Sequence, residues 1–150
     1  MNYFAFTYKY KDVTYKEKKE TEIDILLLSQ LAYLPMDNIN FKNNKKYSLK
    51  EIADNIDRQV FLKSLIAQRN ALKLLDTIKD LPRFKDIKVT CYEYEADINS
   101  QFGAVTFLLP NKKIIIAFQG TDDTISGWKE DACLSYLYPT TSQEMAGNYV

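Results

Sequence analysis

The sequence predicts an α/β fold in which a helical part comes first, a sheet follows, and a further helix closes the chain. Apolar residues recur at helical spacing between residues 21 and 82. From residue 87 onward the chain contains runs rich in β-branched and aromatic residues, separated by turn residues, as strands do. With 150 residues, 46% of them hydrophobic, we expect residues 1–150 to form one domain or a large piece of one.

The N-terminal segment, residues 1–20, alternates aromatic with polar side chains and then becomes charged, which predicts a short extended arm. The first helix begins near Thr21. Thr21 and Asp24 have the spacing of a capping box, in which two side chains satisfy backbone N–H groups at a helix start. Pro35 ends this helix, because proline cannot continue one. Its apolar stripe consists of Ile23, Leu27, Leu31 and Leu34.

Two more helices complete the helical part, residues 21–82. Ser48 and Glu51 form a second capping box, so a short helix should start at Leu49. The longest helix follows it and ends before Pro82. Its predicted stripe consists of Phe61, Leu65, Leu72, Leu75 and Ile78, widened by Leu62 and Ile66.

Three strands are predicted in the second part of the chain, at residues 87–95, 102–109 and 113–118. The turns between them are short, so we expect hairpins. Residues 114–118 contain no polar side chain, which favours a strand that is covered on both faces and lies centrally in the sheet. We therefore expect residues 87–150 to hold a β-meander and then the first crossover helix.

The end of the chain predicts a further strand at residues 134–138 and then a helix. Thr141 and Glu144 have the spacing of a capping box, so the helix should begin there. No glycine, asparagine or basic residue caps its last turn. We therefore expect that the sequence was cut inside this element.

Composition excludes several classes of function. The chain has 20 basic and 20 acidic residues, so no net charge attracts it to nucleic acid or to an anionic lipid surface. Its apolar runs are far shorter than the roughly 20 residues of a membrane-spanning helix, and its N-terminus does not resemble a signal peptide. Cys91 and Cys133 are too few for a disulfide scaffold, which indicates reduced thiols and a cytoplasmic protein.

Metal and cofactor sites are not expected either. Asp122, Asp123, Glu130 and Asp131 lie close together in the sequence but lack the ligand spacing of an EF-hand loop. No other motif in the chain points to a cofactor.

The segment best suited to chemistry is residues 118–124, which begins at the end of the apolar strand. In open α/β sheets, ligands bind at the carboxyl ends of the strands. Gly120 would let the backbone approach a ligand closely, and the amide and hydroxyl of Thr121 could face a developing oxyanion. Asp122 and Trp128 are the candidate substrate-binding residues beside them.

An alternative for the same segment is an ordinary strand-to-loop turn. In that case Thr121 and Asp122 satisfy local backbone groups, and Trp128 packs the loop against the sheet without lining a substrate crevice.

Three blocks of the sequence resemble the Mbeg1-like (DUF2974) family, a bacterial branch of the α/β-hydrolases related to class 3 lipases. The first block runs from Asp24 to Leu34 and includes Ser29, Leu31 and Tyr33. The second reads Phe118-Gln119-Gly120-Thr121-Asp122-Asp123-Thr124 and continues in Gly127-Trp128-Lys129-Glu130-Asp131. The third consists of Gln143, Ala146 and Tyr149.

This resemblance implies the N-terminal portion of an α/β-hydrolase fold, in which Thr121 supplies an oxyanion donor for the hydrolysis of a lipid or other ester-like substrate. One position departs from the family pattern. Gln119 stands where the family usually has arginine, so a charge and a bidentate hydrogen-bonding group are lost.

The remaining catalytic groups of a serine hydrolase are absent from these 150 residues. The chain has no histidine, and none of its serines has the flanking glycines of a G-x-S-x-G nucleophile turn. We therefore expect this segment to be inactive alone and the triad to lie downstream of Val150. The alternative is a binding or protein-interaction module without catalysis. If the fold is incomplete, the apolar surface left uncovered should cause self-association, whereas in the module that surface would be the partner site.

Overall fold

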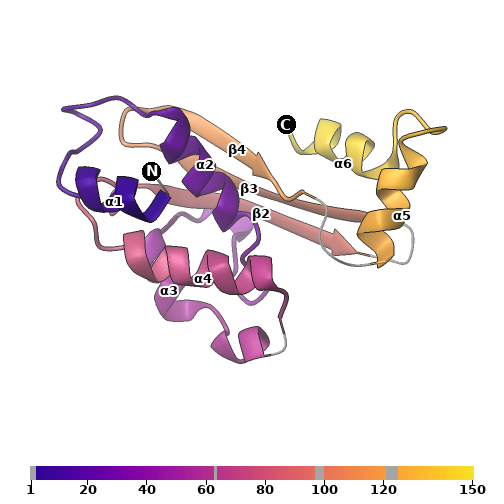
Figure 1. Cartoon of the computed structure of the whole chain (residues 1–150), viewed down its shortest axis with the longest axis horizontal. Helices are drawn as coiled ribbons and strands as arrows, with labels where there is room; N and C mark the ends of the chain where they lie inside the picture. Colours follow the sequence, from indigo (N-terminus) through magenta and orange to yellow (C-terminus); the bar gives the residue numbers. More distant parts are fainter. Residues whose placement is uncertain (1–2, 63, 97–99, 121–124) are drawn as a thin grey trace.

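The computed structural model describes residues 3–62, 64–96, 100–120 and 125–150 (Figure 1). Within them, helices combine with one four-stranded antiparallel sheet, which confirms the mixed helix and strand content. The elements in chain order are α1 (Tyr3–Tyr10), α2 (Glu22–Leu31), η1 (Lys42–Asn44), β1 (Tyr47–Ser48), α3 (Leu49–Asn55), η2 (Arg58–Leu62), α4 (Ile66–Ile78), β2 (Lys88–Ala96), β3 (Gln101–Leu108), β4 (Ile114–Phe118), α5 (Ile125–Cys133) and α6 (Thr141–Tyr149).

The sheet follows the chain, in the order β1-β2-β3-β4. The three strands predicted from composition are present and form the predicted meander. β2 and β3 pair along their whole length, from Lys88 opposite Leu108 to Ala96 opposite Gln101, with an irregularity between Val89 and Cys91. The short strand β1, which pairs only with Lys88 and Val89, was not predicted.

The hydrophobic core lies on one face of the sheet, beneath α2, α3 and α4 (Figure 1). Burial of each large apolar side chain there contributes about 1.5–3 kcal/mol before the opposing entropy is counted. The opposite face is covered in part by α6, whose Tyr149 hydroxyl lies 2.9 Å from Thr106 Oγ1 of β3. The most completely buried core side chains include Leu27, Leu28, Leu31, Leu74, Leu75, Ile78, Phe84, Val105 and Phe107.

Two predicted helix starts are confirmed. The backbone N–H of Thr21 donates to Asp24 Oδ2 at 2.7 Å, and the N–H of Asp24 donates back to Thr21 Oγ1 at 3.4 Å. Ser48 and Glu51 make the same reciprocal pair.

The cap of α6 lies one residue earlier than predicted. Thr140 is the extended capping residue, and its partner is Gln143, whereas the sequence suggested Thr141 and Glu144. Both pairs have the required spacing. Thr140 takes the capping role because it lies buried at the helix start, where its side chain reaches the orphan N–H of Gln143.

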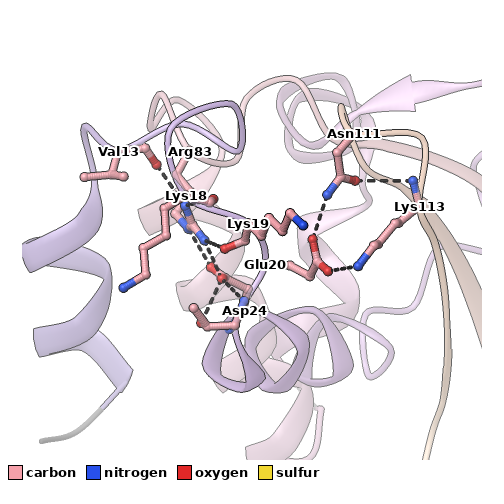
Figure 2. A network of polar contacts seen from close by, with 9 residues as sticks. Val13, Lys18, Lys19, Glu20, Asp24, Arg83, Asn111 and Lys113 are labelled. Carbon is pink, nitrogen blue, oxygen red and sulfur yellow. Dashed lines mark hydrogen bonds and ion pairs between the residues drawn. The ribbon is translucent and has the colours of Figure 1, made fainter.

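A buried ion pair between Arg83 and Asp24 joins distant segments of the chain (Figure 2). Arg83 Nε and Nη2 donate to the two oxygens of Asp24 at 2.7 and 2.6 Å. The remaining N–H groups donate to the carbonyls of Val13, Lys18 and Lys19. All five guanidinium N–H groups therefore have acceptors, although the side chain is only 1% exposed.

A second polar cluster lies beside the first and connects to the sheet (Figure 2). Glu20 accepts from Asn111 Nδ2 at 2.6 Å and pairs with the Lys113 ammonium. Asn111 and Lys113 belong to the hairpin between β3 and β4. The loop before α2 is thus attached both to the turn after α4 and to this hairpin.

The extended arm predicted at residues 1–20 is wrong, because Tyr3–Tyr10 forms the helix α1. The apparent alternation of aromatic and polar residues hid a helical spacing. The rings of Phe6 and Tyr10, four residues apart, have centroids 4.7 Å apart, and Phe6 enters the core.

The single long helix predicted from residue 61 onward is also wrong in its first part. Residues Arg58–Leu62 form the 3-10 turn η2, and α4 begins only at Ile66, after an extended Leu65. Leu62 is 78% exposed and Ile66 64% exposed, so neither widens a buried stripe. Phe61 reaches the core from η2 and not from the helix.

The apolar strand at residues 114–118 is an edge strand and not a central one. β4 lies at the end of the strand order, and Ile114 and Phe118 are 64% and 42% exposed. The strand buried throughout is β3, which has neighbours on both sides. The continuous apolar run therefore pointed to the wrong strand as the central one. In the described structure, α2 covers only one face of β4.

The strand predicted at residues 134–138 is absent. These residues form turns that continue from α5, in which Tyr136 N–H and Leu137 N–H both donate to the carbonyl of Cys133. Their aromatic and apolar side chains are exposed, so no sheet neighbour stabilises an extended conformation.

Candidate functional site

The candidate site begins where β4 ends, at Phe118, and continues through Gln119 and Gly120. Residues 121–124 lie outside the described part of the chain, and Thr121 and Asp122, the predicted oxyanion donor and its neighbour, are among them. The site can therefore be built from the residues that lead into this loop and from those that surround its start.

Gly120 lies against the hydroxyl of Tyr33. A Cβ atom built on Gly120 would lie 3.0 Å from Tyr33 Oη, so a larger residue would crowd the hydroxyl. Gly120 does not have a positive φ angle, which means that close approach, and not an unusual turn conformation, accounts for glycine here. Tyr33 comes from the turn after α2, so this contact brings the first block of the family resemblance to the second.

The Tyr33 hydroxyl is a hydrogen-bond donor placed at the entrance to the loop. Among the described residues, it has no hydrogen-bond partner. The sequence singled out Tyr33 only as part of the resemblance, because nothing in the local pattern shows that the turn after α2 meets the end of β4. Its O–H group can donate to a ligand that approaches the Gly120 backbone.

Gln119 is fixed across the sheet at the position where the family usually has arginine. Its N–H donates to the Gly103 carbonyl at 2.7 Å. Its side chain lies over Gly103, because a Cβ atom on Gly103 would come within 2.5 Å of Gln119 Oε1 and 2.9 Å of Gln119 Cβ. Gly103 thus makes room for this side chain, a pairing that the sequence did not reveal.

Three aromatic rings pack beside the end of β4. The ring centroids of Phe102, Phe118 and Tyr149 lie 6.1 to 6.3 Å apart in each pair, in tilted or edge-to-face geometry. Burial raises the pKa of Tyr149 to about 12, and its hydroxyl hydrogen-bonds with Thr106 Oγ1 of β3. α6 is in this way attached to the strand that leads into the site.

Trp128 lies on α5 and is 68% exposed. The alternative in which it packs the loop against the sheet is therefore wrong. Its indole is available to a ligand, but nothing in the described geometry joins it to Gly120 or Tyr33.

The described residues contain no group of three or more histidine, cysteine, aspartate or glutamate side chains that could hold a metal ion. Within the same residues, no helix is both long and apolar enough to cross a lipid bilayer.

A groove of about 730 Å³ lies on the β2 side of the sheet. Its walls are residues 36–42, which follow α2, and residues 91–95 of β2. Phe102 and Met145 also line it. The sequence did not predict this groove, because the groove depends on how residues 36–42 pack beside β2.

Comparison with known families finds one family model that matches part of the chain. The Mbeg1-like family model matches residues 78–150, which include β2 to β4, the loop after Gly120 and α6. The block from Asp24 to Leu34 lies outside the matched residues. A search of curated proteins and a search of solved structures found no match.

Proposed function

We propose that this chain is the oxyanion-side portion of a serine hydrolase of the α/β-hydrolase type, which acts on lipid or other ester-like acyl substrates. In such a reaction a tetrahedral intermediate carries a negative oxygen, and hydrogen-bond donors placed where this charge develops lower the barrier. Thr121 is the proposed donor, through its amide or its hydroxyl. Gly120, Asp122 and Trp128 are proposed to contact the substrate.

The observation that carries this proposal is the contact between Gly120 and Tyr33 at the end of β4. A Cβ atom on Gly120, the residue before Thr121, would lie 3.0 Å from the Tyr33 hydroxyl, so this hydroxyl approaches the backbone closely. A backbone without a side chain, next to a phenol that has no other partner among the described residues, suits an oxygen anion better than a bulky apolar group. The family match over the same strand and loop supports the assignment.

The chain does not supply a nucleophile or a base for this reaction. It contains no histidine and no serine in a G-x-S-x-G turn, and an oxyanion donor without an attacking group has nothing to stabilise. The proposed role is therefore one part of a catalytic site whose serine, acid and histidine lie elsewhere.

The test uses the protein encoded by the whole reading frame, expressed to its stop codon. We expect a G-x-S-x-G segment and a later histidine after Val150, labelling of that serine by a fluorophosphonate, and esterase activity. Thr121→Ala should then lower kcat by about 10- to 1,000-fold with little change in KM, as for the loss of one transition-state donor.

Thr77→Ala is the matched control, because Thr77 lies on the exposed side of α4 and donates only to the Lys73 carbonyl. It should leave kcat unchanged. The proposed function would be refuted by a reading frame without the serine and histidine. It would also be refuted by an active protein that folds and keeps its kcat in both the Thr121→Ala and the Thr121→Pro variants.

A second candidate function, an interaction module without catalysis, is favoured by one observation. β4 is an edge strand with exposed apolar side chains, and such an edge can pair with a strand of another chain. The same reading-frame experiment separates the two functions, because an interaction module needs no nucleophile.

A further inference from the structure

The groove beside β2 contains none of the residues proposed for the oxyanion site, although it shares Phe102 with the aromatic cluster next to the end of β4. We propose that this groove binds an extended basic peptide, which adds to the sheet as a strand along the edge of β2. Three features favour such a ligand: the course of the groove, the direction of one peptide group, and the side chains along the two walls.

The groove wraps around the edge of β2, because residues 36–42 line it on the core side and Phe102 and Met145 line it on the opposite side. Side chains of successive strand residues point to opposite faces. Five successive residues, 91–95, nevertheless line the groove, which requires that it follow the strand edge. The neighbouring strand β1 pairs only with Lys88 and Val89, so it leaves this stretch of the edge uncovered.

The hydrogen-bond register shows which peptide groups face the groove. In an antiparallel ladder, alternate residues direct N–H and C=O to the same neighbour. Gln119 N–H donates to the Gly103 carbonyl, so Gly103 faces β4 and Ala104 faces its partner Glu93 on β2. The next residue along β2, Tyr92, then directs its N–H and C=O away from β3. Neither of these groups has a backbone partner among the described residues.

The side chains on the two faces of this edge differ in character. On the core face, the Tyr92 hydroxyl approaches Asp37 Oδ2 at 3.5 Å, and the Tyr92 ring lies 6.2 Å from that of Phe41, so aromatic rings form a floor. On the opposite face, Glu93 and Glu95 carry exposed carboxylates.

This arrangement defines the chemistry of the ligand. A strand added beside β2 places alternate side chains over the aromatic floor and the others beside Glu93 and Glu95. The first set should be apolar and the second basic. The groove is lined by the carboxylates of Asp37, Glu93 and Glu95 and by one cation, Lys42, so its charge complements lysine or arginine. Main-chain hydrogen bonds then supply affinity, and the alternation supplies specificity.

The experiment measures fluorescence anisotropy of a labelled peptide of sequence Lys-Val-Lys-Val-Lys, with blocked ends, in the presence of the protein. We expect saturable binding that weakens as salt is added, and no binding of Glu-Val-Glu-Val-Glu. The double variant Glu93→Gln and Glu95→Gln should weaken binding by about 10-fold, a few-fold for each exposed charge pair. The control double variant Asp54→Asn and Asp86→Asn removes two exposed carboxylates elsewhere and should bind like the original protein.

A third peptide tests strand addition itself. This peptide is Lys-Val-Lys-Val-Lys with both valine residues N-methylated. The methyl groups remove main-chain N–H donors without changing the charge, so this peptide should not bind. The proposal would be overturned if the methylated or the acidic peptide bound as tightly as Lys-Val-Lys-Val-Lys. It would also be overturned if the control variant weakened binding as much as the Glu93 and Glu95 variant, or if no binding occurred up to about 1 mM peptide.

Discussion

At the scale of single residues, Arg83 joins three parts of the chain that are far apart in sequence. Its guanidinium contacts the start of α2 through Asp24 and the segment before α2 through three carbonyls. It also lies over the ring of Tyr15, 4.5 Å from the ring centroid. Replacing such a buried pair by apolar groups can be neutral, but removing one partner leaves the other charge without compensation.

Arg83→Met should therefore lower the free energy of unfolding by about 3–5 kcal/mol. Arg58→Met is the matched control, since Arg58 makes a bidentate pair with Asp76 on the surface, and it should cost about 1 kcal/mol or less. Urea denaturation of the two variants decides the point. Equal losses of unfolding free energy in the two variants would mean that the buried Arg83 pair contributes no more to stability than the exposed Arg58 pair.

Glu20 predicts a measurable acid dependence. The hydrogen bond from Lys113 is the main cause that lowers the pKa of Glu20 from its ordinary value of 4.5 to about 2. A carboxyl whose pKa is lower in the folded protein stabilises it fully above the ordinary value, and this contribution disappears as the pH falls toward the folded value.

The urea midpoint of the original protein should therefore fall more steeply between about pH 5 and pH 2 than that of Glu20→Gln. Glu17, Glu51 and Asp76, whose pKa values are also lowered, titrate in both proteins, so the difference isolates Glu20. Parallel curves for the two proteins would show that the contact with Lys113 does not contribute.

At the scale of elements, two glycines with opposite surroundings test how β3 and β4 fit together. Gly103→Ala places a methyl group against Gln119, including its Cβ at 2.9 Å, so the strands must shift. We expect a loss of about 1–3 kcal/mol. Gly147→Ala meets nothing within 4 Å and lies inside α6, so it should stabilise the protein by about 0.5–1 kcal/mol. Thermal unfolding should move in opposite directions, and a neutral Gly103→Ala would contradict the described packing.

The sequence correctly predicted the elements that depend on residues close together in the chain. The capping boxes at Thr21 and Ser48 and the three strands of the meander depend on neighbours within a few residues, and they are confirmed. α1 was missed because Phe6 is held by the core, and the central strand was misassigned because coverage of β4 depends on its neighbours and not on its composition.

The same division applies to the candidate site. The sequence singled out the segment after β4 as a candidate, because its position and its residue types are local features. It could not show that Tyr33 touches Gly120, that Gln119 lies over Gly103, or that β2 has an uncovered edge, because each depends on tertiary contacts between distant segments.

At the scale of the whole molecule, the apolar edge at β4 should make the 150-residue chain self-associate. We expect dimers or larger species at micromolar concentration, binding of the dye ANS, and a broad unfolding transition. Ile114→Lys should reduce this association, whereas Leu62→Lys, at an apolar position on η2 that is even more exposed, should not. Sedimentation velocity compares them, and a sharply melting monomer that binds no dye would contradict the expectation.

The most direct test of the central claim, that this chain holds the oxyanion side of a hydrolase without its nucleophile and base, is the rate at which it hydrolyses a short-chain nitrophenyl ester. The account predicts a rate equal to that of a blank without protein, because the chain has no histidine and no serine in a nucleophile turn. Turnover that persists through repurification and is inhibited by a serine-directed phosphonate would contradict it.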